Sequence, residues 1–64
     1  MKKGSILKRK NIEVHIVDVE FDFDGIVIIE FEVFNHRTGT ASDLNYSNIN
    51  HFREKFENYS LFKK

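Results

Sequence analysis

Apolar and polar residues alternate along two stretches in the first half of the chain. In residues 12–23 the apolar side chains occupy even-numbered positions as far as Ile16 and odd-numbered positions from Val17 onward. Alternation is the period of a β-strand with one buried face, and a one-residue change of phase is what a β-bulge or a sharp bend produces. The pattern therefore predicts a long, bulged strand. Residues 26–34 predict a second strand, one face of which carries Val27, Ile29, Phe31 and Val33.

The turn between these two strands determines their register. An Asp-Gly pair lies between them, which is a strong local signal for a hairpin. A two-residue loop would pair Val19 with Glu30 and place an acid among the core positions. A three-residue loop over residues 23–25, with Gly25 in the left-handed conformation, pairs Val19 with Ile29 instead. We therefore expect the longer turn and a core that contains Val17, Val19, Phe21, Val27, Ile29 and Phe31.

A third strand and a helix are expected in the second half of the chain. A two-residue Thr-Gly turn would pair Phe31 with Tyr46, which predicts a strand over residues 40–46. Residues 48–58 predict a helix with either Ser47 or Asn48 as its N-cap. Its apolar stripe has spacings of three, four and three, at Ile49, Phe52, Phe56 and Tyr59.

The two ends of the chain allow more than one interpretation. Residues 1–11 form a basic N-terminal segment in which Ser5 to Lys8 is either a short edge strand or part of a frayed terminus. Residues 60–64 are a tail or a short closing strand around Leu61. The whole chain is one domain, residues 1–64. Its expected class is α+β, a small antiparallel β-meander or SH3-like barrel of three to five strands with one C-terminal amphipathic helix.

The order of these features resembles the small SH3-like barrels found in many short phage and prophage proteins. The resemblance covers most of the chain and rests on a Lys-x-Gly start, a Thr-Gly turn, a leucine and a closing Phe-x-x-x-Phe-Glu, at Lys2-Lys3-Gly4, Thr38-Gly39, Leu44 and residues 52–57. The expected helix is longer than the single turn usual in that fold, which keeps a plain antiparallel sheet with one packed helix as the alternative. The resemblance implies a binding module and no specific ligand.

Charge is segregated along the chain although the net charge is zero. Residues 1–11 carry five Lys or Arg and no acid, residues 12–35 carry seven acids and no Lys or Arg, and residues 36–64 carry five bases and three acids. The predicted register gathers acids on the strand face opposite the core and sets Asp18 across from Glu30. Like charges directly opposite each other destabilise a sheet, so stability alone does not explain this arrangement.

The acidic face is accordingly the predicted working surface. We expect a non-enzymatic protein-binding module that docks onto a basic groove through Asp18, Glu20, Asp22, Ile28, Glu30 and Glu32. Because basic grooves usually hold nucleic acid, the sharpest form of this hypothesis is a phage-encoded inhibitor of a host defence factor. The alternative is that the acids only keep an edge-prone hairpin soluble and unpaired.

Other function classes rank lower. Nucleic acid is a less favoured partner, because only the basic N-terminal segment would attract it and the neighbouring sheet is acidic. A small-ligand (nucleotide) sponge acting as an oligomer is a further alternative, and a homodimer would supply burial that so short a chain lacks. The three histidines, His15, His36 and His51, lack metal-ligand spacing, and His15 faces Val33 in the predicted register. We expect no metal, cofactor or catalytic residue.

The expected location is the cytoplasm, or the host cytoplasm for a phage-encoded protein. The chain has no cysteine, its basic start is not followed by the apolar run of a signal peptide, and no stretch approaches the length of a membrane span.

Overall fold

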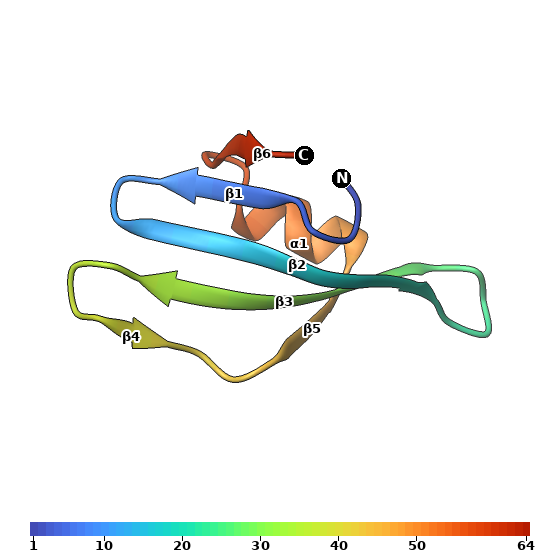
Figure 1. The fold of residues 1–64 in the computed structure, drawn as a ribbon. Helices are drawn as coiled ribbons and strands as arrows, with labels where there is room; N and C mark the ends of the chain where they lie inside the picture. The colour runs from blue at the N-terminus through green and yellow to red at the C-terminus, as the bar shows by residue number, and fades with distance from the viewer.

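The computed structural model describes residues 1–64 as one antiparallel sheet with a short helix on one face (Figure 1). The sheet has six strands in the order β4-β3-β2-β1-β6, and β5 also pairs with β3. The edge strands β4 and β6 do not pair with each other, so the α+β class is confirmed but the sheet does not close into a barrel. The elements are β1 (Ile6–Arg9), β2 (Ile12–Phe21), β3 (Val27–Asn35), β4 (Thr40–Ala41), β5 (Asn45–Asn48), α1 (Ile49–Lys55) and β6 (Ser60–Lys63).

The bulge in β2 is present where the change of phase predicts it. Ile16 pairs with Phe31 and Asp18 pairs with Glu30, so Val17 is an extra residue without a partner on β3. The predicted pairing of Val17 with Phe31 is therefore wrong by one residue. The bulge absorbs Val17, which lets the residues before and after it both direct apolar side chains to the core face.

The β2–β3 turn is confirmed as a three-residue loop. Phe21 pairs with Val27, and beyond this pair the Asp22 N–H donates to the carbonyl of Ile26 at 3.0 Å. Gly25 has a φ of 77°, and its N–H donates to the carbonyl of Asp22 at 3.0 Å. This left-handed position favours glycine because a Cβ there would be strained.

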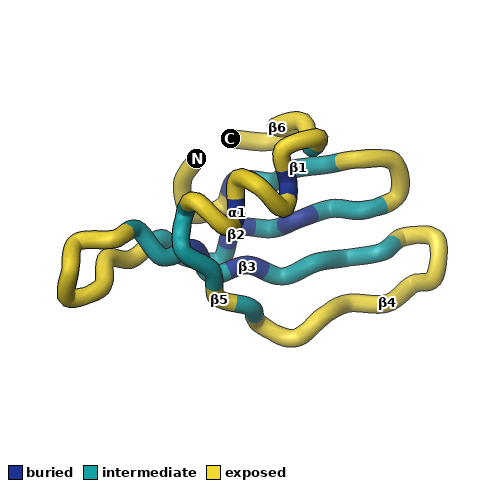
Figure 2. Tube along the Cα trace, turned by 180° about the vertical axis from the view of Figure 1, so that it is seen from behind, coloured by how far each residue is buried: buried dark blue, intermediate teal, exposed yellow.

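The core lies between α1 and the inner face of the sheet, which is the face that the helix covers (Figure 2). Phe31 on β3 meets Phe52 of the helix edge-on, with ring centroids 5.1 Å apart. Val19 and Val27 are partly buried against this cluster as predicted. The buried apolar residues are Val14, Ile16, Ile29, Phe31, Phe52 and Phe56.

Phe21 is the clearest error in the predicted core, because 72% of it is exposed. It lies on the inner side of the hairpin, but the β2–β3 hairpin projects past the helix, and nothing covers its tip (Figures 1 and 2). The helix has seven residues, or roughly 10 Å of length, which is too short to reach the end of the hairpin. Val17, the bulge residue, is half-buried and is also outside the core.

The predicted third strand, residues 40–46, is broken into β4 and β5. Asn35 pairs with Thr40, so the loop contains residues 36–39 rather than two residues. The Asn35 side chain causes the difference, because its Oδ1 accepts the N–H of Arg37 at 3.0 Å and stabilises a wider turn.

The break between β4 and β5 follows from Ser42. The Ser42 N–H donates to the carbonyl of Val33 at 2.8 Å, and the Ser42 hydroxyl accepts the N–H of Val33 at 2.9 Å. The Ser42 side chain here takes the place of a backbone acceptor for the Val33 N–H, and the strand resumes in a new register beyond it. As a result Phe31 pairs with Asn45, and the predicted pairing of Phe31 with Tyr46 is wrong.

The helix begins as predicted and ends early. The Asn48 side chain accepts the N–H of His51 at 2.9 Å, which makes Asn48, and not Ser47, the N-cap. The helix ends at Lys55, three residues short of the predicted end, although Phe56 and Tyr59 still pack with their rings 5.0 Å apart.

The chain ends are strands. The closing strand is confirmed as β6, which pairs with β1. Residues near Ser5 form β1, but it lies between β2 and β6, so it is not an edge strand.

Candidate functional site

The outer face of the sheet, opposite the helix, has no element packed over it (Figures 1 and 2). Directly paired residues share a face of a sheet, so the register determines what this surface presents. Asp18 pairs with Glu30, and Glu20 pairs with Ile28. The bulge before Asp18 creates this arrangement, because it shifts the acids of the second half of β2 to the outer face.

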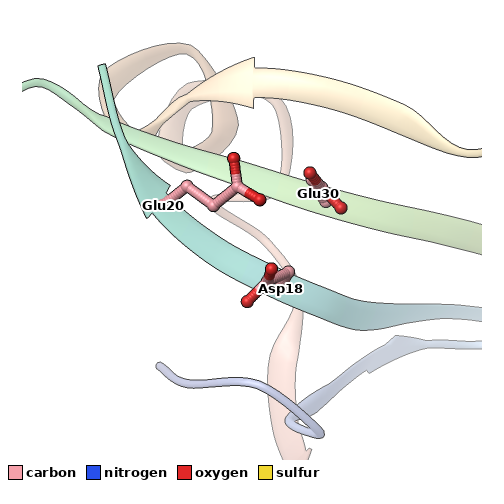
Figure 3. A group of neighbouring side chains, drawn as sticks. All are labelled: Asp18, Glu20 and Glu30. Carbon is pink, nitrogen blue, oxygen red and sulfur yellow. The ribbon is translucent and has the colours of Figure 1, made fainter. Parts of the chain in front are cut away.

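Three of the predicted site residues form a tight acidic cluster, defined as Asp18, Glu20 and Glu30 (Figure 3). One carboxylate oxygen from each lies within 4.8 Å of the other two. The charge of Glu30, with a further contribution from Asp18, raises the pKa of Glu20 above its ordinary value. The cluster therefore has a repulsion that an approaching cation would relieve.

Apolar surface adjoins the acidic cluster. Tyr46 on β5 pairs with Glu30, and it is 63% exposed. Beside it the sheet and the start of the helix border a shallow, open hollow of about 380 Å³ in which polar and apolar residues are mixed. Its lining residues are Asp22, Ile26, Ile28, Tyr46, Ser47, Asn48 and Asn50. The carboxylates and this partly apolar hollow thus adjoin each other.

The remaining predicted site residues have different positions. Ile28 lines the hollow, as does Asp22, but the Asp22 carboxylate is already used by the turn. Its Oδ1 accepts the backbone N–H groups of Asp24 and Ile26, both at 2.9 Å. Glu32 pairs with His15 further along the sheet and is not part of the acidic cluster.

Tyr46 is a site residue that the sequence does not predict, whereas alternation along residues 26–34 already places Ile26 on the face of Ile28 and Glu30. The alternation predicts that Tyr46 pairs with Phe31 and so faces the core, and the change of register at Ser42 reverses this. Ile26 is 43% exposed because it belongs to the loop side of the hairpin.

A second cluster of titratable groups lies at the other end of the outer face. The two oxygens of Glu13 contact the Nε2 atoms of His15 and His36, at 2.9 Å and 2.7 Å. The expectation that His15 faces Val33 is wrong, because the bulge lies beyond it and its partner is Glu32. The hydrogen bond from His15, together with the charge of His36, holds the pKa of Glu13 below its ordinary value.

Basic residues gather at the β1–β6 edge, away from the acidic cluster. Ile6 of the basic N-terminal segment pairs with Lys63, so this segment lies beside the C-terminal lysines. The Lys8 ammonium lies 4.9 Å from the centroid of the Phe62 ring. Segregation of charge along the sequence thus becomes segregation across the sheet.

Comparison with known proteins leaves these surfaces as the available guide to function. No protein-family model, curated protein or solved structure matches the chain. The one helix of the structure is far too short to cross a lipid bilayer.

Proposed function

We propose that this chain is a non-enzymatic protein-binding module that docks onto a basic protein surface through the outer face of its β2–β3 hairpin. One observation carries the proposal, which is the convergence of Asp18, Glu20 and Glu30 within 4.8 Å beside an open, partly apolar hollow. Neither half of this surface is covered by another element of the chain.

The chemistry of the surface favours an arginine-containing partner. Repulsion among the three carboxylates is relieved when a guanidinium lies between them, and planar guanidinium groups match carboxylates with paired hydrogen bonds. Exposed Tyr46 and half-buried Ile28 offer apolar area beside the charges. Charge sets the orientation of the partner, and the apolar side chains of the hollow supply burial.

A narrower form of the proposal is inhibition of a nucleic-acid-binding host factor, such as a defence nuclease. A basic groove that accepts this acidic surface is one that ordinarily accepts phosphates. The domain would act by occupying the groove, and this role requires no catalytic residue.

Charge reversal tests the proposal. Glu20→Lys with Glu30→Lys inverts the acidic cluster, whereas Asp43→Lys with Glu54→Lys makes the same change in net charge at exposed positions off the outer face. In affinity capture from host lysate, we expect the first pair to lose a protein that the wild type and the second pair both retain. Equal retention by both pairs, or equal loss, contradicts the proposal.

Nucleic-acid binding remains a second candidate because of the β1–β6 edge. The pairing of β1 with β6 brings Lys63 and Lys64 beside the basic side chains of residues 1–11. A mobility shift with duplex DNA and single-stranded RNA at low salt tests it. Binding that weakens with rising salt supports this candidate, and no shift at low salt removes it.

A further inference from the structure

Glu13 lies between two imidazoles at the end of the outer face opposite the acidic cluster. Its Oε1 contacts His15 Nε2 at 2.9 Å and its Oε2 contacts His36 Nε2 at 2.7 Å. The Glu13 side chain is only 17% exposed. The proposed docking surface does not include any of these three side chains.

The local structure holds these groups in place from two directions. Glu13 and His15 are two residues apart on β2, so they share the outer face. The His15 ring packs edge-on against Phe34, with centroids 4.6 Å apart. His36 follows β3, and its backbone N–H donates to the carbonyl of Asn11 at 2.8 Å.

We propose that Glu13, His15 and His36 bind a divalent transition-metal ion of the Zn²⁺ type. Two imidazole nitrogens and one carboxylate are the ligand set of open zinc sites, in which water completes a tetrahedron. Glu32 is the cross-strand partner of His15, so a second carboxylate is carried on the same face of the sheet.

Ion binding requires the three side chains to rearrange. Ligands around tetrahedral Zn²⁺ are roughly 3.4 Å apart, so the carboxylate must separate from each imidazole by about half an ångström. The imidazoles must also converge, since only the acidic cluster has three ligand atoms within 4.8 Å of one another. His36 is the side chain that can move, because it is 56% exposed on a turn. The ion takes the place of the Nε2 proton, and each neutral ring then carries its proton on Nδ1.

The surrounding charges permit a cation at this position. Lys8 pairs with Glu13 across the strands, but its ammonium lies over the Phe62 ring. Arg37 adjoins His36 in sequence and is exposed on the turn. On the other side Glu32 adds a second carboxylate beside His15.

This site and the acidic cluster should prefer different metal ions, because only this site contains imidazoles. An all-carboxylate group such as Asp18, Glu20 and Glu30 suits Mg²⁺ or Ca²⁺, whereas imidazole nitrogens favour Zn²⁺, Cu²⁺ and Ni²⁺. A bound ion would tie the turn over residues 36–39 to β2 and so stabilise the folded chain.

The test is a titration of the full chain with ZnCl₂, followed by calorimetry and by NMR of the imidazole resonances. We expect one ion per chain, with large shifts at His15 and His36 and none at His51, the third histidine. His15→Ala and His36→Ala should each weaken binding ~10-fold or more, while His51→Ala leaves it unchanged. His36 is on an exposed turn, so its variant should fold, and circular dichroism of each variant confirms this.

Three results would overturn the site. They are the absence of saturable Zn²⁺ binding, an equal loss of affinity in the His51→Ala control, and Zn²⁺ binding that disappears in Asp18→Asn with Glu20→Gln but survives His36→Ala. The last of these would assign the ion to the acidic cluster. Because the readout needs no protein partner, it is independent of the docking proposal.

Discussion

At the scale of single residues, two glutamates on the same face of the sheet have opposite surroundings. Glu13 accepts hydrogen bonds from two imidazoles, and Glu20 faces two other carboxylates. The pKa of Glu13 is accordingly lowered and that of Glu20 raised. The two residues should therefore contribute to stability with opposite dependence on pH.

The lowered pKa of Glu13 predicts a loss of stability in acid. A carboxyl whose pKa is depressed by folding stabilises the native state above its unfolded pKa, and this contribution is lost as the pH falls through the folded value. Glu13→Gln should flatten the acid limb of the unfolding free energy, measured by urea denaturation at a series of pH values. Glu57→Gln, at an exposed position on the helix side, is the control, and an unchanged acid limb in Glu13→Gln contradicts the assignment.

The raised pKa of Glu20 predicts that the acidic cluster is destabilising at neutral pH. The penalty is absent below the unfolded pKa and grows as the pH rises through the raised value. Glu30→Gln removes the largest cause and should raise the melting temperature at pH 7 by roughly 1–5 °C. Calorimetry should show a smaller gain at pH 3, and a lower melting temperature at pH 7 would contradict the repulsion.

At the scale of elements, the β2–β3 hairpin could be predicted from sequence because its signals are local. The alternation and the Asp-Gly pair specify a register that the structure confirms from the turn as far as Asp18 and Glu30. Before the bulge the pairing is displaced by one residue, so the predicted partners of Val17 and His15 are wrong. The break between β4 and β5 could not be predicted in this way. It depends on backbone N–H groups that donate to the side-chain oxygens of Asn35 and Ser42, and these hydrogen bonds compete with backbone pairing.

Of the candidate site, too, one part could be predicted from the sequence and another could not. Asp18, Glu20 and Glu30 follow from strand register, which alternation encodes. The approach of His36 to Glu13 depends on how the turn after β3 is closed, and no spacing rule links residues so far apart in the chain.

The hairpin turn itself yields a prediction about backbone strain. Gly25 has a φ of 77°, and a Cβ added there would meet no atom within 4 Å. Gly25→Ala should therefore cost only the left-handed backbone penalty, ~1–2 kcal/mol of unfolding free energy. Gly25→Asn should cost less, because asparagine tolerates this region better. Equal stability of the alanine variant and the wild type in urea denaturation would show that residue 25 does not adopt the left-handed conformation.

At the scale of the whole molecule, a very small core supports a long projecting hairpin. Six apolar residues are buried, whereas Phe21 and Phe23 at the projecting end are 72% and 110% exposed. A core of this size supplies only ~3–5 kcal/mol. The fold is thus marginally stable, and the outer face and the hairpin tip contribute little to it.

Because the fold is marginally stable, truncating a side chain in the core should have a much larger effect than truncating one at the hairpin tip. Phe52→Ala removes a ring that is 1% exposed and should cost ~3–5 kcal/mol, enough to unfold the chain at 25 °C. Phe23→Ala at the hairpin tip should leave the melting temperature within about 2 °C of the wild type. Circular dichroism distinguishes the two, and a folded Phe52→Ala variant would contradict the location of the core.

The central claim is that the acidic cluster and its hollow are a docking surface. The most direct measurement is the affinity of the captured partner for the purified chain, by calorimetry, in the wild type, in Glu20→Lys with Glu30→Lys, and in Asp43→Lys with Glu54→Lys. We expect the first pair to lose at least ~10-fold in affinity, about 1.4 kcal/mol, and the second pair to change by less than about twofold. Affinities that fall equally in the two pairs, or in neither, would contradict the claim.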